Sequence, residues 1–300
     1  MSRPVATALL VLCTMFWGFA FIAQKSAMDA MGPLTFASAR YLLGGIVILP
    51  LAIREYRRRR ADLTGRQWLL LGAMTLAFFG GSWLQQAGLV HTTVTNGGFL
   101  TGLYVFFVPL ILLLLLRQRP HPIVWLGVPL ALTGLFLLNG ASLDRLNVGD
   151  GLVMGSALFW AAHVLTLGMI ARATGLPIFV SAVAFLGAGL LALPLAFLFE
   201  APTLAGLSMG WVEIAYAGIL STAVSFTLQA IGQQYVPPAN AAIILSGESL
   251  FAALGGAVVL GERLHPAGYA GAGLIFVAIV LVEAVPILRQ RHTARMAASG

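Results

Sequence analysis

The sequence predicts an all-α membrane protein in which ten transmembrane helices form two inverted five-helix repeats around a central cavity. Three features lead to this prediction: an apolar composition, ten apolar runs of membrane-spanning length, and similarity between the two halves of the chain. Of the 300 residues, 59% are hydrophobic and only 9% are charged. So few charged residues cannot cover a water-soluble protein of this length, so the solvent around the chain must be lipid.

A helix needs about 20 mostly apolar residues to cross the hydrocarbon core of a bilayer. One such run alone would also fit a buried core helix or a signal peptide. The first run, however, lacks a small-residue cleavage site, and a soluble core has no use for so many apolar helices. We expect ten membrane spans, at residues 5–24, 35–53, 68–89, 96–116, 123–138, 149–170, 178–199, 211–231, 239–260 and 266–288.

The basic residues predict the orientation in the membrane. The formal net charge of +7 would suggest nucleic-acid binding in a soluble protein, but here the positive-inside rule explains it better. With cytoplasmic termini, thirteen of the seventeen Lys and Arg residues lie on the inner side, and the exceptions are Lys25, Arg40, Arg145 and Arg263. We therefore expect a multi-pass protein of the cell inner membrane with both termini in the cytoplasm and no nucleic-acid partner.

The two halves of the chain are similar at an offset of 144 residues, which brings scarce polar residues into register: Gln85 with Gln229, Asn96 with Asn240, Arg119 with Arg263, and His121 with His265. Phe16 and Trp17 match Phe159 and Trp160 at an offset of 143. We assign residues 1–143 and 144–300 to two repeats, the second ending in a short basic cytoplasmic tail. Because each repeat holds an odd number of spans, the copies are inverted, which is the plan of many secondary transporters. Duplication kept only for packing is the alternative.

Several short motifs occur in the order typical of one family. They are Phe16-Trp17-Gly18 followed by Lys25, then Arg40, the segment around Asn96, and residues 260–264 with the sequence LGERL. In this respect the chain resembles the drug/metabolite transporter superfamily, EamA type. The resemblance implies a bundle in which the first four helices of each half surround a central cavity while the fifth is peripheral. It also implies export of small metabolites, with exporters of amino acids, including aromatic ones, as a prominent branch.

Ionisable side chains are costly inside a bilayer and therefore indicate function or a protein partner. Lys25 and Arg40 either reach the outer interface with their charged ends or bind a substrate carboxylate; Arg40 suits the second role better because its planar fork forms two parallel hydrogen bonds. Glu248, well inside the ninth predicted span, has three possible roles: pairing with a substrate ammonium, carrying a proton, or forming a structural hydrogen bond.

Uncharged polar and aromatic residues complete the predicted site. Gln85 and Gln229 are cavity candidates because repeat-related positions converge at the axis, whereas Asn96 and Asn240 are interpreted as N-caps. Helix-to-helix hydrogen bonding and simple packing are the competing roles for these polar and aromatic residues. His163 is either a proton site or a neutral, hydrogen-bonded histidine. The predicted substrate-binding residues are Trp17, Arg40, Phe79, Gln85, Tyr104, Trp160, His163, Gln229, Ser246 and Glu248, with Trp83 and Phe99 as further aromatic candidates.

The chemistry that the sequence lacks also narrows the function. It has no phosphate-binding GxxxxGK[ST] motif, no HExxH motif, no EF-hand loop and a single cysteine, so we expect no cofactor, no metal and no direct use of ATP. The prediction is a secondary transporter, not an enzyme, that exports small organic metabolites by alternating access, most simply amino acids, including aromatic or bulky apolar ones. Efflux of drugs or other solutes is the alternative within transport; a membrane-bound enzyme or scaffold is the alternative outside it. A monomer is the working hypothesis for the oligomeric state.

The orientation is directly testable. Epitope tags at either terminus, or inserted after Arg60, are expected to be protected from antibody in intact cells and to become accessible after the membrane is permeabilised. The reason is the excess of basic residues on that side of the predicted topology. Labelling of the tag after Arg60 from outside intact cells would contradict the assignment.

Overall fold

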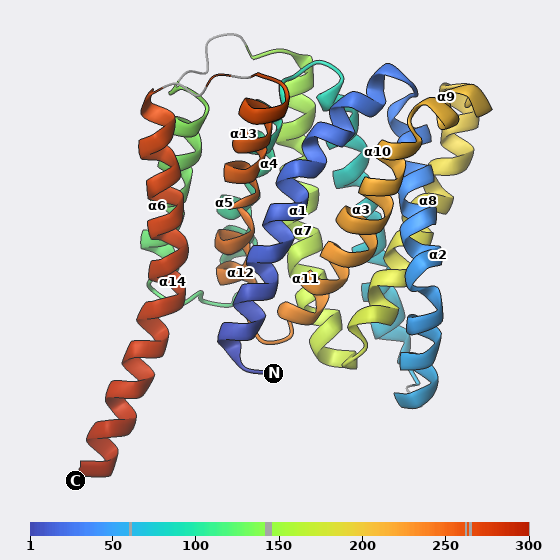
Figure 1. Cartoon of the computed structure of the whole chain (residues 1–300). Coiled ribbons are helices and arrows are strands. Elements are labelled where there is room, and N and C mark those ends of the chain that lie inside the picture. Colours follow the sequence, from blue (N-terminus) through green and yellow to red (C-terminus); the bar gives the residue numbers. More distant parts are fainter. Residues whose placement is uncertain (60–61, 142–145, 262, 264–265, 300) are drawn as a thin grey trace.

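The structure is a helical bundle whose two chain ends lie at the same end of the bundle (Figure 1). This computed structural model describes residues 1–59, 62–141, 146–261, 263 and 266–299. In this part of the chain, nine helical segments are long and apolar enough to cross a membrane, and α6 (Val124–Leu138) is a shorter apolar helix that corresponds to the fifth predicted span. The ten-helix, all-α prediction is therefore confirmed.

Besides α6, six predicted spans are single helices apart from short turns at their ends, and the remaining three are assembled from consecutive helical segments. The single helices are α1 (Arg3–Ser26, extended by η1, Ala27–Asp29), α2 (Pro33–Arg59), α3 (Gly65–Leu89), α7 (Val148–Thr174), α8 (Pro177–Phe199) and α14 (Pro266–Ser299). The assembled spans are α4 (Val94–Thr101) with α5 (Tyr104–Leu114), α10 (Trp211–Ala215) with the π-helix η2 (Tyr216–Phe226) and α11 (Thr227–Gly232), and α12 (Pro238–Leu245) with α13 (Glu248–Val259). A short helix, α9 (Leu204–Met209), precedes α10.

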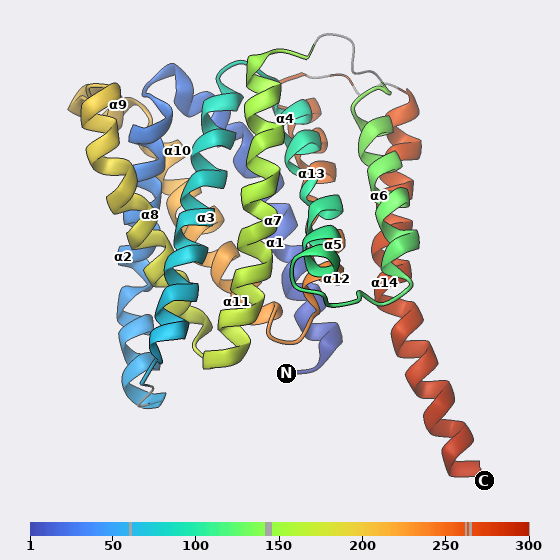
Figure 2. The same ribbon diagram turned by 180° about the vertical axis from the view of Figure 1, so that it is seen from behind.

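The fifth helices of the two halves, α6 and α14, pack on each other at one side of the bundle, as both views show (Figures 1 and 2). The remaining helices pair between halves. Helix α3 lies beside α7, and α2 lies beside α8, while α1 packs on η2 and α11 (Figure 2). The first four spans of each half therefore form one unit whose interior is shared between the repeats, and the fifth spans lie outside it.

Helices α2 and α8 run antiparallel and cap each other. The Glu200 carboxylate follows α8 and accepts hydrogen bonds from the backbone N–H groups of Leu34 and Thr35 at 2.7 and 2.8 Å, at the start of α2. In the reverse direction Glu55, near the end of α2, accepts from the Phe179 N–H at 2.8 Å, at the start of α8. Each carboxylate satisfies backbone donors that a helix start leaves free and interacts favourably with the positive end of the helix dipole.

Two basic side chains cap the ends of the third spans. The Lys25 ammonium donates to the carbonyl oxygens of Leu89 and Val90 at 2.8 and 3.1 Å, where α3 ends. The Arg172 guanidinium donates to the carbonyl oxygen of Gln233 at 2.9 Å, where α11 ends. Leu89 and Gln233 are 144 residues apart, so the repeats share this cap. Lys25 therefore stabilises a helix end, a role that the sequence interpretations of this residue did not include.

The structure changes one detail of the predicted topology and leaves others outside the described residues. Arg57, Arg58 and Arg59 belong to the last turn of α2 rather than to a loop, because basic side chains favour the negative end of a helix. The predicted boundary between the repeats, residues 143 and 144, lies outside the described residues, and so do Arg60, Arg145 and His265.

Close helix packing predicts a sharp contrast between two glycines of α3. A Cβ atom on Gly88 would lie 2.5 Å from the carbonyl oxygen of Gly149 and from Val153, whereas one on Gly72 would meet nothing within 4 Å. We expect Gly88→Ala to destabilise the protein by about 1–3 kcal/mol because α3 and α7 must move apart. Gly72→Ala is the matched control and is expected to be neutral or stabilising, since alanine favours a helix by about 0.5–1 kcal/mol. Thermal unfolding midpoints in detergent test this, and equal midpoints for the two variants would contradict it.

Candidate functional site

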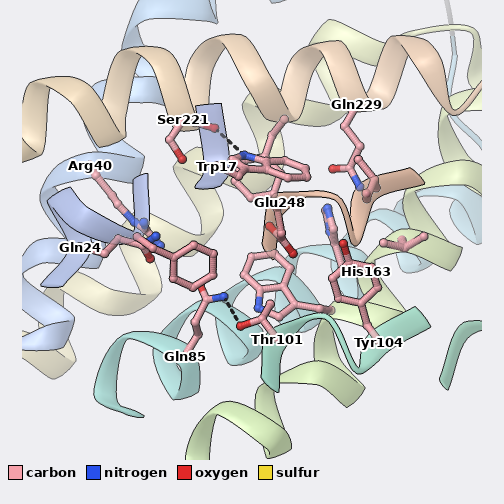
Figure 3. A pocket seen from close by; sticks show the side chains of 15 residues that line it. Trp17, Gln24, Arg40, Gln85, Thr101, Tyr104, His163, Ser221, Gln229 and Glu248 are labelled. Carbon is pink, nitrogen blue, oxygen red and sulfur yellow. Dashed lines mark hydrogen bonds between the residues drawn. The ribbon is translucent and has the colours of Figure 1, made fainter. Parts of the chain in front are cut away.

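A cavity lies at the centre of the bundle and is built on the repeat axis. Fifteen side chains line it, with about 40 Å³ of free space between them (Figure 3). Ten of the fifteen form five repeat-related pairs, at offsets of 143 on the first helices and 144 elsewhere: Trp17 with Trp160, Phe21 with Val164, Gln85 with Gln229, Thr101 with Leu245, and Tyr104 with Glu248. Substrate sites in inverted-repeat transporters lie at this position, between the two repeats.

The broken helices explain why the cavity forms here. The fourth span is interrupted between Thr101 and Tyr104, and the ninth between Leu245 and Glu248, at positions 144 residues apart. Each interruption places a lining side chain at the end of one segment and another at the start of the next. Breaks of this kind are tolerated at membrane depth only where protein or a cavity surrounds them.

Aromatic rings form one wall of the cavity around Phe226. The Phe226 ring lies 4.5 Å from Trp17 and 5.7 Å from Trp160 between centroids, and it is stacked on Trp160. The Trp17 indole N–H donates to the carbonyl oxygen of Ser221 at 3.0 Å, within the π-helical segment η2, and so fixes its ring (Figure 3). This wall offers a surface for apolar or aromatic groups and for cations.

Arg40 brings a positive charge into the cavity from α2. Its side chain is 3% exposed, so it does not reach the membrane interface, and the interface-anchor interpretation is wrong. The guanidinium donates to the Tyr41 hydroxyl and lies 5.3 Å from the Phe36 ring centroid and 4.5 Å from that of Tyr41. These contacts position the planar group, and its Nε atom has no hydrogen-bond partner. The guanidinium therefore retains donors for an anion such as a carboxylate.

Glu248 brings a negative charge into the same cavity from the first residue of α13. Its side chain is 5% exposed, and the ion pair found among the described residues joins Arg3 to Glu283, so no base contacts Glu248 there. Its repeat-mate Tyr104 lies close enough to interact with it, although the Tyr104 hydroxyl has no hydrogen bond of ordinary geometry. Figure 3 shows Glu248 near the centre of the lining residues and Arg40 at one edge.

Several other lining groups are hydrogen-bonded incompletely. His163 approaches Gln229 and the Met74 backbone, but neither of its ring nitrogens forms a hydrogen bond of ordinary geometry. The buried side-chain atoms of the cavity that lack a partner are Gln24 Oε1, Tyr104 Oη, Trp160 Nε1 and Gln229 Oε1, in addition to Arg40 Nε and both nitrogens of His163. Buried polar groups are nearly always satisfied, so this set indicates a site made for a polar ligand or ordered water.

Eight of the ten predicted site residues line the cavity: Trp17, Arg40, Gln85, Tyr104, Trp160, His163, Gln229 and Glu248. Two do not. Phe79 is partly buried against the core and stacks on Trp83, which is 37% exposed, outside the cavity lining. Ser246 is fully buried in the break between α12 and α13, where its hydroxyl donates to the Ile243 carbonyl oxygen at 2.7 Å instead of turning to the cavity.

Asn96 and Asn240 are not N-caps, contrary to the sequence prediction. Both occupy the third position of their helices, after Thr93 and Pro237 as the N-cap residues. From there the Asn96 amide donates to the Asp150 carboxylate, which also accepts from the Thr92 hydroxyl at 2.6 Å. The Asn240 amide donates to the Val282 carbonyl oxygen at 2.7 Å, next to Glu283, whose carboxylate binds Arg3 through two hydrogen bonds. Repeat-related asparagines thus tie helices together at opposite ends of the bundle.

Sequence reasoning missed seven lining residues: Phe21, Gln24, Thr101, Val164, Ser221, Phe226 and Leu245. A signal existed for several of them. Phe21 and Gln24 follow Trp17 at helical spacings of four and seven, so they share its face. The offset of 144 pairs Thr101 with Leu245. No comparable signal marks Ser221 and Phe226, because the π-helical turn of η2 changes which side chains face inward.

Comparisons with known proteins agree with this architecture. A model of the EamA-like transporter family matches residues 5–140 and again residues 147–284. An uncharacterized transporter of Archaeoglobus fulgidus is 32% identical over 94% of this chain and 87% of its own length. The threonine/homoserine exporter RhtA of Escherichia coli (strain K12) is 30% identical over 90% of this chain and 88% of its own length. A solved crystal structure has the same fold, with a TM-score of 0.77 at 18% identity over 95% of this chain and 98% of that one.

The aromatic wall leads to a prediction about two tryptophans. Trp160→Ala removes a cavity ring that stacks on Phe226, and we expect transport to fall about tenfold, equivalent to ~1.4 kcal/mol. Trp17→Ala is expected to act in the same direction. Trp125→Ala, on the peripheral helix α6 and at a position 42% exposed, is the matched control and is expected to transport at the parental rate. Flux in proteoliposomes, normalised to inserted protein, tests this. Parental flux in both cavity variants would show that the two rings only pack.

Proposed function

Because the chain belongs to the EamA-like transporter family, we propose that it is a secondary transporter that exports amino acids from the cytoplasm by alternating access. The family and its relatives are transporters, which excludes the enzyme alternative. Helices of membrane-spanning length support a multi-pass membrane protein with a small-molecule substrate. Beyond the family assignment, we propose that the protein lies in the inner membrane with cytoplasmic termini, that it transports outward, and that its substrates are amino acids.

One observation supports the substrate class. The cavity holds one buried cation, Arg40, and one buried anion, Glu248, and neither is in an ion pair within the described part of the chain. A buried charge without a counter-ion is costly, so the site favours a ligand that brings both missing charges. A free amino acid is such a ligand: its carboxylate fits the Arg40 fork, and its ammonium fits the Glu248 carboxylate and the tryptophan faces.

The rest of the cavity suits the amino-acid side chain. The rings of Trp17, Trp160 and Phe226 favour bulky apolar or aromatic groups, while the amide of Gln229 and the hydroxyl of Tyr104 have unused hydrogen-bonding capacity. The name of the relative RhtA assigns it threonine and homoserine, which carry hydroxyl groups. Both kinds of side chain therefore belong in the first panel of substrates.

The asparagine contacts supply elements for alternating access. At one end, Asn96 joins α4 of the first half to Asp150 on α7 of the second half. At the other end, Arg3 joins α1 of the first half to Glu283 on α14 of the second half, beside Asn240. We propose that these two sets of contacts break alternately, so that each end of the cavity opens in turn.

Direct transport measurements test the proposed function. Purified protein in proteoliposomes is assayed for exchange of labelled L-threonine, L-homoserine, L-phenylalanine and L-tryptophan against the same unlabelled compound. We expect saturable exchange of at least one of them. Exchange of none of the four, together with flux of an apolar organic cation that carries no carboxylate, would favour the alternative of drug efflux.

The role of Arg40 yields a sharper prediction. Arg40→Lys keeps the charge but loses the fork that holds two carboxylate oxygens, so we expect apparent affinity for the free amino acid to fall about tenfold, or ~1.4 kcal/mol. The methyl ester of the same amino acid lacks the carboxylate and should be affected much less. Concentration-dependent flux of both compounds measures the difference.

Arg66→Lys is the matched control, because Arg66 is exposed at the start of α3, away from the cavity. It should leave both compounds at the parental values. Equal losses for acid and ester in Arg40→Lys would remove Arg40 from carboxylate recognition.

A further inference from the structure

Glu248 and Tyr104 occupy equivalent positions in the two repeats, but only one of them is a carboxylic acid. Each is the first residue after the break in its span, and both line the cavity. Building on the function proposed above, we propose that the Glu248 carboxyl group exchanges the substrate ammonium for a proton, so that the transporter is an amino-acid/proton antiporter with one proton per substrate.

The argument starts from the cost of an unpaired charge at this depth. A carboxylate that is 5% exposed in the middle of a membrane protein, with no base in ion-pair contact in the described residues, is not stable as a bare anion. Two partners can neutralise the negative charge of the carboxylate: a substrate ammonium when the site is loaded, and a proton when it is empty. Because one carboxylate cannot hold both, binding of one displaces the other.

The neighbours of Glu248 indicate that its own carboxyl is the group that gains and loses a proton during transport. Helices α4 and α6, which pack on α13, contain no titratable residue. On α1, Lys25 is bound to the end of α3, and the Cys13 thiol donates to the Ser225 carbonyl oxygen at 3.1 Å. The other titratable groups of the cavity lining are Arg40, Tyr104 and His163.

Each of these three groups has a different role available to it. Arg40 remains charged at any physiological pH and is held by the rings of Phe36 and Tyr41. Tyr104 is a phenol, which stays neutral in ordinary conditions and lies close enough to interact with Glu248. His163 lies among aromatic rings, 5.1 Å from Phe78 and 5.8 Å from Trp160 between ring centroids, an apolar setting that disfavours a charged imidazole.

The resulting cycle balances protons and charge. The loaded site, with the zwitterion between Arg40 and the Glu248 carboxylate, opens outward. The substrate leaves with its own three ammonium protons, and the carboxylate takes one proton from the outer solution. The protonated, empty site opens inward, where binding of the next ammonium returns that proton to the cytoplasm. An inward proton gradient therefore drives export.

Two assays on the same proteoliposomes test the coupling, with each of the four amino acids named above and with the membrane potential clamped by potassium and valinomycin. The first measures exchange at equal proton concentration on both sides. The second measures accumulation when the lumen is about tenfold more acidic than the medium. One-proton coupling predicts roughly tenfold accumulation by the parental protein. A pH indicator in the lumen should report proton loss when the substrate is added.

The variants separate coupling from binding and folding. Glu248→Gln is expected to retain some exchange but to lower the accumulation ratio to about one, whereas Glu248→Asp, which keeps a carboxyl, should restore accumulation. Glu213→Gln makes the same chemical change on α10, outside the cavity lining, and should accumulate substrate like the parent. If Glu248→Gln does not insert, the comparison of Glu248→Asp with the parent and the indicator signal remain.

The outcomes distinguish this inference from the proposed function. Exchange without gradient-driven accumulation in the parent would overturn the antiport mechanism and leave the substrate class intact. Parental accumulation in Glu248→Gln would overturn the assignment to this residue. Absence of exchange for all four amino acids would overturn the proposed function on which the antiport mechanism rests.

Discussion

The constraint on which the rest of this structure depends is that backbone polar groups inside a bilayer must be satisfied by the protein itself. At the surface of the bundle, unbroken helices satisfy these groups through their own backbone hydrogen bonds. The interruption after α4 meets this constraint through short-range backbone bonds, such as the one from the Val105 N–H to the Gly102 carbonyl oxygen at 3.0 Å. The Ser249 hydroxyl of α13 adds a second donor to the nearby Gly98 carbonyl oxygen at 2.7 Å. The cavity thus lies where two broken spans meet, since lipid would not tolerate those breaks.

The same constraint gives several charged side chains a structural role. Glu55, Glu200, Lys25 and Arg172 bind free backbone groups at helix ends, where their charges also oppose the helix dipoles. The buried charged residues in the described part of the chain are Arg40, Asp150, Glu248 and Glu283. Asp150 accepts hydrogen bonds from Thr92, from Asn96 of α4 and from the N-cap of its own helix, and Glu283 accepts them from Arg3 and Thr7 of α1. Arg40 and Glu248 therefore stand apart, because structural hydrogen bonds account for the other two buried charges and not for these two.

Sequence patterns predicted the fold well because lipid makes hydropathy and repetition dominate. They predicted the cavity through repeat-related pairs such as Trp17 with Trp160 and Gln85 with Gln229. Sequence patterns failed to predict the role of a residue where that role depends on which way its side chain points. Phe79 and Phe78 are neighbours on α3, yet Phe78 is fully buried among rings while Phe79 is only partly buried and stacks on the exposed Trp83. Asn96 looked like a cap because its true role, binding Asp150, joins helices distant in sequence.

The repeats are most alike near the helix ends and least alike at the charged centre of the cavity. Asn96 and Asn240 have the same position in their helices, and the caps at Leu89 and Gln233 are equivalent. Such symmetry gives the two ends of the cavity comparable contacts, which a transporter needs if both of its states are to be populated. At the centre, by contrast, Tyr104 faces Glu248, and Arg40 on α2 has Ala184 as its counterpart on α8. A symmetric centre would present like charges to the substrate from both sides, whereas this one presents opposite charges. A zwitterion can then bind in a single orientation, and the asymmetry of the site, rather than that of the scaffold, determines what the symmetric scaffold carries.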